Sequence, residues 1–262
     1  MILAILQARV GSSRLHGKVL KEVLGKPLIQ YEIERIKRSK KIDKLVLATS
    51  DREEDKQFIS VAGNSEIESF SGSENDVLDR YYQCARLYNP DAVVRLTGDM
   101  PIHDPDVIDK VITIYEQNQV DCVSNTYETS YPDGLDTEVM KMSALETAYK
   151  EATLPSEREH VTPYIYNNAN SYGKRLFKML VVKNGVDYSH LRWTIDEEAD
   201  FLLIKEIIEE LYPSNPCFTW IDVISLLAKR PELLNINNKI ERNEGFRKSL
   251  IRDEEIKSEN EP

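Results

Sequence analysis

The first eighteen residues constrain the fold most, because an apolar run passes directly into a segment rich in glycine and cations. Residues 1–6 read MILAIL, which is typical of a buried strand, and residues 7–18, which we call the basic loop, read QARVGSSRLHGK. Glycines let this backbone approach a ligand closely, serines offer hydroxyl and amide donors, and cations attract anions. The residues concerned are Gly11, Gly17, Ser12, Ser13, Arg9, Arg14 and Lys18. The segment therefore predicts a strand that opens into a phosphate-binding loop.

Two common phosphate-binding motifs do not fit the basic loop. A Walker A loop needs Ser or Thr directly after its Gly-Lys pair, whereas Val19 follows Gly17-Lys18. The dinucleotide-binding pattern Gly-x-Gly-x-x-Gly is absent as well. Surface turns often contain glycine and serine without binding anything, so an ordinary turn is the alternative interpretation. Three cations directly after a buried strand favour the phosphate interpretation.

The composition excludes several classes of protein. The chain has 262 residues, 41% of them hydrophobic, and a net charge of −11, which predicts a sizeable core and no broad attraction to nucleic acid or anionic membranes. No apolar run approaches the ~20 residues that a membrane span requires, and Met1 leads directly into the expected strand, so we expect a cytoplasmic protein. The cysteines form no CxxC pair, and we expect packing roles for Cys84, Cys122 and Cys217.

The rest of the sequence alternates expected strands and helices, which predicts an α/β fold. Strands are expected at 45–49, 67–70, 92–97, 121–124, 177–182 and 191–195. In the second half, helices are expected at 143–152, 157–168, 197–211 and 220–227. From about residue 235 the chain becomes polar and highly charged, and we expect this tail to be partly helical, partly disordered and not catalytic.

Two aspartates stand where expected strands end. Asp99 lies in LTGDMP and Asp196 in RWTID, and ligand groups of open α/β sheets gather beyond the carboxyl ends of strands. Mg²⁺ held by one or two carboxylates and bridging to substrate phosphates fits such a pair. In the alternative interpretation each aspartate merely caps the next helix. That alternative is weaker for Asp99, because Gly98 and Pro101 give it a loop rather than a helix start.

Three separated motifs resemble those of the cytidylyltransferases that activate acidic sugars. They are QARVGSSRLxGK at 7–18, LxGDxP at 96–101, and Ile195-Asp196 with Asp200. The branch they resemble is called spore coat polysaccharide biosynthesis protein F, and it is related to the CMP-KDO and CMP-sialic acid synthetases. The resemblance covers about residues 1–230. Members of the branch usually have proline where this chain has His16, a difference that leaves the cations in place.

The resemblance implies a three-layer, Rossmann-like fold of the nucleotide-diphospho-sugar transferase (GT-A-like) type, with a mixed, mostly parallel sheet. Residues 1–232 would form the nucleotidyltransferase domain, with an inserted dimerisation or acceptor region at about 125–170, and 233–262 the charged tail. A homodimer is expected.

The resemblance also implies roles for individual residues. CTP would be bound by Gln7, Ala8, Arg9, Gly11, Ser13, Arg14, Lys18, Asp76 and Arg80. Of these, Arg9 and Lys18 would be catalytic, because they would stabilise charge on the attacked α-phosphate. Asp99 and Asp196 would bind Mg²⁺. Glu138 and His160 lie in segments that resemble those meeting the acceptor or the partner subunit, although a plain strand residue and a helix-capping histidine are equally good interpretations.

The expected reaction joins CTP and an acidic sugar of the nonulosonic type to give a CMP-sugar and pyrophosphate, for surface polysaccharide or glycan synthesis. A phosphorylated small polyol or acid is an alternative acceptor. A glycosyltransferase of similar fold usually shows Asp-x-Asp at the strand end, whereas Met100-Pro101 follows Asp99 here. A catalytically silent nucleotide-binding partner is the remaining alternative.

Overall fold

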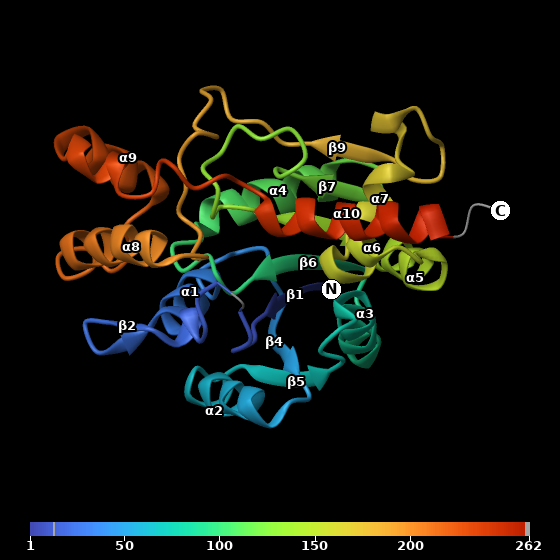
Figure 1. The fold of residues 1–262 in the computed structure, drawn as a ribbon, viewed down its shortest axis with the longest axis horizontal. Coiled ribbons are helices and arrows are strands. Elements are labelled where there is room, and N and C mark those ends of the chain that lie inside the picture. The colour runs from blue at the N-terminus through green and yellow to red at the C-terminus, as the bar shows by residue number, and fades with distance from the viewer. Residues whose placement is uncertain (13, 260–262) are drawn as a thin grey trace.

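The computed structural model describes residues 1–12 and 14–259, and its centre is a sheet of seven strands (Figure 1). Their order across the sheet is β5-β4-β1-β6-β8-β7-β9. Neighbouring strands pair in parallel except at β8, which is antiparallel to β6 and β7. This confirms the expected mixed, mostly parallel sheet. The strands are β1 (Ile2–Gln7), β4 (Lys44–Ser50), β5 (Glu68–Gly72), β6 (Ala92–Thr97), β7 (Cys122–Ser124), β8 (Glu138–Lys141) and β9 (Met179–Val181), and a small hairpin pairs β2 (Glu22–Val23) with β3 (Lys26–Pro27).

Alternation of side chains along the central strands creates one core on each face of the sheet. Along β1, Ala4 and Leu6 belong to one core, and Leu3 and Ile5 to the other. The first core is covered by α1 (Leu28–Ile36), α2 (Gln57–Asn64), α4 (Pro105–Gln117), α8 (Glu198–Leu211) and α9 (Trp220–Lys229). The second is covered by α3 (Val77–Tyr88), α5 (Met142–Glu151) and α7 (Pro163–Asn167). The expected three-layer α/β architecture is therefore confirmed.

The region expected to be one helix at 157–168 is two short helices. The first, α6 (Pro155–His160), ends at Val161, whose φ of 72° and ψ of −55° lie in a region that is costly for a β-branched residue. The Thr162 amide donates to the His160 carbonyl at 2.8 Å, which makes this a γ-turn of the strained kind. Pro163, which has no amide hydrogen, then begins α7. The single-helix prediction was wrong because of this break.

The strand expected at 191–195 is not part of the sheet. Its backbone bonds to loops instead: the Trp193 amide donates to the Asp133 carbonyl at 2.6 Å, and the Ile195 amide to the Asp99 carbonyl at 2.8 Å. Gly134 makes this packing possible, because its φ is +112° and a Cβ there would lie 2.7 Å from the Trp193 carbonyl carbon. Apolar residues alternate in this segment because one side packs in the core, not because it pairs with a sheet neighbour.

The charged tail contains a 16-residue helix, α10 (Glu244–Glu259), after the short 3₁₀ helix η4 (Pro231–Asn235). In Figure 1, α10 is drawn in red and crosses α6, and the two helices are in contact. Two polar residues of α10, Ser249 and Asp253, are buried in this contact. Within the described residues, every helix is too short or too polar to cross a membrane.

Candidate active site

A polar cavity of about 410 Å³ lies at the edge of the sheet where β1 and β6 end and β8 begins. Gln7, Thr97 and Glu138, the residues at those three strand ends, all line it, together with the basic loop and α10. A ligand site is expected at this edge, since the carboxyl ends of parallel strands meet there.

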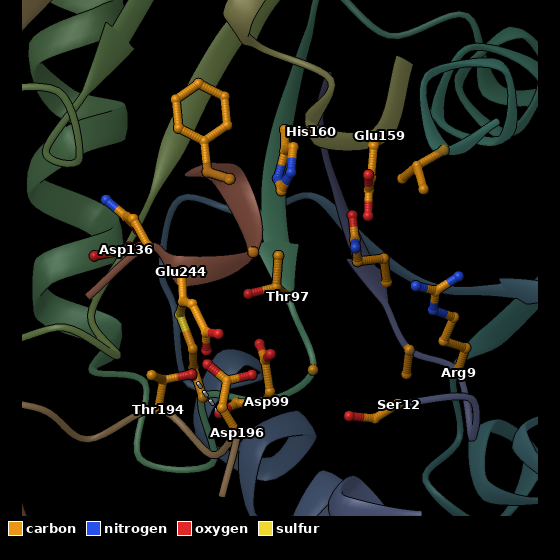
Figure 2. Close-up of a pocket in the computed structure, with 18 of the residues that line it drawn as sticks. Arg9, Ser12, Thr97, Asp99, Asp136, Glu159, His160, Thr194, Asp196 and Glu244 are labelled. Atoms are coloured by element: carbon orange, nitrogen blue, oxygen red, sulfur yellow. Dashed lines mark hydrogen bonds between the residues drawn. The ribbon is translucent and has the colours of Figure 1, made fainter. Parts of the chain in front are cut away.

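The cavity has two ends that differ in their side chains. Figure 2 shows Asp99 and Asp196 together at one end, which we call the aspartate end. His160 and Glu159 point into the cavity at the other, which we call the helix end because α10 covers it. Thr97 lies between the two ends.

At the aspartate end, the Lys18 ammonium lies between two carboxylates. Its Nζ is 2.7 Å from Asp99 Oδ2 and 2.8 Å from Asp196 Oδ1. Gly17, with a φ of 65°, turns the chain so that Lys18 begins the 3₁₀ helix η1 (Lys18–Leu20) and is 8% exposed. Burial alone would lower the pKa of Lys18, but the two carboxylates outweigh burial and raise it. Lys18 is therefore a fixed positive charge.

Asp196 also contacts two guanidinium groups. Arg14 Nη2 is 2.7 Å from Asp196 Oδ1, and Arg192 Nη2 is 2.7 Å from Oδ2. Burial raises the pKa of Asp196, but Lys18 and the two arginines outweigh it and lower the pKa to about 2. Arg14 also contacts Glu244 of α10, with 2.9 Å between Nη1 and Oε2, so the basic loop is linked to the tail.

Asp99 reaches the cavity because the residue before it has no side chain. A Cβ on Gly98 would lie 2.8 Å from Ile29 Cδ1 and 3.0 Å from the Gln7 carbonyl oxygen. The Gly98 amide donates to that same carbonyl at 2.8 Å, which continues the pairing of β6 with β1. The Ile195–Asp99 backbone bond then brings Asp196 opposite Asp99 without a strand.

The two aspartates fit Mg²⁺ only together with a bound phosphate. Among residues 1–12 and 14–259, no cluster of three or more Asp, Glu, His or Cys side chains could hold a metal alone. Mg²⁺ commonly takes one or two carboxylates and completes its shell with water and substrate phosphate oxygens. Asp99 and Asp196 supply hard oxygens of that kind next to the basic loop.

Arg9 and Arg80 line the cavity, and neither has a carboxylate partner in the part of the chain that the structure describes. Arg9 is exposed. Arg80 is 1% exposed, its Nη1 donates to the Ser73 carbonyl at 3.1 Å, and its buried Nε has no partner among the described residues. Burial lowers the pKa of Arg80. Because neither Arg9 nor Arg80 is paired with a carboxylate, the part of the cavity that they line would attract a polyanion.

The other expected nucleotide-binding residues fall into three groups. Gln7, Ala8 and Gly11 line the cavity, and Gln7 Oε1 is buried without a partner among the described residues. Asp76 does not line the cavity: it caps α3 by accepting from the Asp79 amide and binds Arg158 Nε at 3.0 Å. Ser13 lies outside the described residues.

Glu138 is buried, and both of its carboxylate oxygens are already hydrogen-bonded. Oε2 accepts from Arg95 Nη1, and Oε1 accepts from Thr162 Oγ1 at 2.9 Å and Thr126 Oγ1 at 3.3 Å. The antiparallel pairing of β6 with β8 places Arg95 directly opposite Glu138. Burial lowers the pKa of Arg95, but Glu138 outweighs burial and raises it. Glu138 therefore orients Arg95, which lines the cavity.

His160 is held at the helix end by α10. Its Nε2 is 3.0 Å from Ser249 Oγ, and its ring meets Phe246 edge-on with 5.1 Å between ring centres. Burial, followed by the charge of Arg95, lowers the pKa of His160 to about 4. The imidazole is therefore neutral at pH 7.

Three features of the cavity were absent from the sequence prediction: Arg95, Arg192 and α10. Arg95 had a signal, because it is the only charged residue in the apolar strand AVVRLT. A charge inside such a strand needs a partner or a function. Arg192 precedes the recognised Asp196, and it binds Asp133 at 2.8 Å and Asp200 at 3.0 Å as well as Asp196. Residues 244–259 carry no local signal of a role in the cavity.

The fold, the cationic loop and the carboxylates beside it define a nucleotidyltransferase. The chain belongs to the cytidylyltransferase family, whose model matches residues 3–219. Family membership makes it a CTP-dependent enzyme, as the resemblance implied.

Individual proteins resemble the chain over most of its length. Spore coat polysaccharide biosynthesis protein SpsF of Bacillus subtilis is 32% identical over 236 residues, which cover 88% of this chain and 95% of that protein. The 3-deoxy-manno-octulosonate cytidylyltransferase of Chlamydia trachomatis is 28% identical over 219 residues, which cover 79% and 83%. A solved cytidylyltransferase structure from Leptospira borgpetersenii superposes with a TM-score of 0.84 at 31% identity, over 92% of this chain and 99% of that chain.

Proposed function

We propose that this enzyme transfers CMP from CTP to an acidic sugar of the nonulosonic type with the help of Mg²⁺, for polysaccharide or glycan synthesis. The observation that carries the proposal is the aspartate end, where Lys18 lies between two carboxylates in the cavity that the unpaired Arg9 and Arg80 also line. A triphosphate and a metal ion together would satisfy all of these charges.

Binding requires an exchange of partners at the aspartate end. The triphosphate would take the cations Arg14 and Lys18 from their carboxylates, which would leave Asp99 and the Oδ1 atom of Asp196 free to hold Mg²⁺, while Arg192 keeps Oδ2. When bound, the ion supplies positive charge that neutralises the phosphate oxygens. Because Lys18 is buried and permanently charged, its position is fixed before the substrate arrives.

In the transfer step, an acceptor hydroxyl oxygen bonds to the α-phosphorus and loses its proton to solvent. The bond from the α-phosphorus to the oxygen that bridges to the β-phosphate breaks, and pyrophosphate leaves with that oxygen. Arg9 and Lys18 neutralise the charge on the α-phosphate during this step. Glu138 takes part indirectly, since it orients Arg95 toward the acceptor, and His160 lines the same part of the cavity.

The relatives support the choice of acceptor by their names: one acts in spore coat polysaccharide biosynthesis and another is a 3-deoxy-manno-octulosonate cytidylyltransferase. We also propose a homodimer, as the resemblance implies, and we propose the cytoplasm as its location. Membership of the cytidylyltransferase family sets aside the two alternatives of a glycosyltransferase and a silent nucleotide-binding partner.

The test is pyrophosphate release with each nucleoside triphosphate across a panel of nonulosonic acids and phosphorylated polyols. We expect turnover with CTP and an acid, and a loss of about 10²-fold or more in Asp99→Ala. Asp51→Ala is the matched control, because Asp51 follows β4 in the same way without lining the cavity. Full turnover by Asp99→Ala would refute the metal assignment, and turnover only with a phosphorylated polyol would refute the acceptor class.

A further inference from the structure

Helix α10 forms one wall of the cavity although it lies beyond residues 3–219, the part of the chain that the family model matches. Six of the first nine residues of this helix line the cavity, so a broad side of it faces the site. They are Glu244, Gly245, Phe246, Lys248, Ser249 and Arg252. Ile251 is not among the lining residues, and its side chain is 57% exposed.

Buried polar contacts fix α10 to the rest of the domain. Asp253 is 3% exposed, and its two carboxylate oxygens accept from the amide and the hydroxyl of Ser156 at 2.9 and 2.5 Å. Before the helix, Arg242 Nη2 donates to Asp136 Oδ1 at 2.8 Å. Burying a charged group costs free energy of desolvation, so such a group is found this deep only where hydrogen bonds or ion pairs compensate that cost. The segment is therefore an integral wall of the cavity.

Ser249 connects α10 to the side chains at the helix end. Its hydroxyl is buried, donates to Glu159 Oε2 at 2.8 Å and lies 3.0 Å from His160 Nε2. Phe246 covers the edge of the same imidazole. The orientations of His160 and Glu159 toward the cavity are thus set by α10, and not by α6 alone.

The two ends of the cavity suit different parts of a reacting pair. Lys18 and Arg14 of the basic loop lie at the aspartate end, so the triphosphate belongs there. The helix end offers a neutral imidazole, a carboxylate and the Arg95 guanidinium, which suit the hydroxyls and the carboxylate of an acidic sugar. Lys248 and Arg252 add positive charge on the α10 side.

We propose that α10 selects the acceptor, with Phe246 shaping the space for an acidic sugar and Ser249 positioning His160 and Glu159 to bind its hydroxyls. This inference rests on the proposed function, because it assigns the acceptor to the helix end. It adds a specificity element that lies outside the family-matched region.

The test compares Ser249→Ala and Phe246→Ala with Ile251→Ala, a control at an exposed position of the same helix that does not line the cavity. CTP, Mg²⁺ and two acids, 3-deoxy-manno-octulosonate and N-acetylneuraminate, are the probes. We expect the KM for the acid to rise about tenfold in Ser249→Ala, the effect of one lost hydrogen bond, while the KM for CTP stays within about twofold. Phe246→Ala should change the preference between the two acids, and Ile251→Ala should change neither.

Three outcomes would overturn the inference. The first is an unchanged KM for the acid in both cavity-lining variants, and the second is an equal rise in the KM for CTP. The third is that neither acid raises the melting temperature of the wild type in the presence of Mg²⁺ and a non-hydrolysable CTP analogue. The melting temperature is also measured with the CTP analogue and Mg²⁺ but without an acid. If the analogue does not raise the melting temperature, the proposed function itself is contradicted. If Phe246→Ala detaches α10 from the rest of the domain, Phe246→Leu repeats the comparison with a larger apolar side chain retained.

Discussion

The two ends of the cavity differ in how their charged side chains are stabilised. At the aspartate end, Lys18 and Arg14 are neutralised by carboxylates that a ligand must displace. At the helix end, Arg95 keeps Glu138 as its partner, and His160 is half-buried and held in its neutral form. The aspartate end is thus built to exchange partners, whereas the helix end presents a preformed surface. Variants at the first end should change chemistry and metal dependence, and variants at the second should change acceptor affinity alone.

The largest expected effect is that of Lys18→Met, which removes the buried cation and keeps the bulk of the side chain. We expect kcat/KM to fall roughly 10²–10³-fold, because a positioned charge at the α-phosphate is lost. Without substrate, Asp99 would lose its cation while Asp196 would keep only Arg14 and Arg192, so Mg²⁺ should raise the melting temperature of the variant more than that of the wild type. Lys21→Met, at a surface pair with Glu198, is the control. Turnover at the wild-type rate, or a rise in melting temperature with Mg²⁺ no larger than that of the wild type, would contradict the proposed difference between the two ends.

A smaller and more local effect is expected from Asp253→Ala. It leaves the Ser156 amide and hydroxyl buried without their partner, a cost of about 1–3 kcal/mol. Amide exchange should quicken in α10, and the KM for the acid should rise while the affinity for CTP is kept. Glu255→Ala, an exposed acid on the same helix, is the control. If CTP binding weakened as much as acceptor binding, the two ends would not be separable.

The smallest expected effect is a pH dependence of the helix end. Burial and Arg95 lower the pKa of His160 from 6.5 to about 4. The unfolded chain therefore takes up a proton that the folded chain resists. Stability from this group is complete above pH 6.5 and is lost as the pH falls toward 4. The protection factors of the α10 amides, which remove the intrinsic pH dependence of exchange, should therefore fall between pH 7 and 5.

A comparison with His160→Gln isolates this contribution. Other buried groups titrate in the same range with the opposite sign: burial raises the pKa of Asp133 to about 7, so its protonation favours the folded state as the pH falls. The glutamine variant should lose only the pH dependence that comes from His160. His190→Gln changes an exposed histidine and should behave as the wild type does. Identical pH profiles in all three proteins would contradict a His160 that is neutral at pH 7.

The aspartate end was largely predictable from sequence because its key residues follow short local motifs. The apolar run at 1–6 predicts a buried strand, and the basic loop that follows it predicts a phosphate site at the end of that strand. In LTGDMP, Asp99 stands where an expected strand passes into a loop. Asp196 was found by its motif, but the reason for its position was wrong. Its segment bonds to the Asp99 and Asp133 loops rather than to a strand, and no local pattern encodes such a contact.

The helix end was poorly predictable because its contacts join residues far apart in the chain. Arg95 meets Glu138 only through the antiparallel pairing of β6 with β8, which a sequence of alternating strands and helices does not specify. Ser156 and Asp253 are 97 residues apart. Residues 244–259 are charged and only weakly amphipathic, so composition alone indicates a solvated tail.

The contact between Ser156 and Asp253 joins residues 97 positions apart, so the wall that α10 forms can close only after residues 244–253 have been synthesised. Chains fold from the N-terminal side as they leave the ribosome, so the sheet and the basic loop can form while α10 is still inside the exit tunnel. A nascent chain at that stage would hold a nucleotide before it could discriminate between sugars. Selectivity would be acquired last, when residues 244–253 emerge and close the wall.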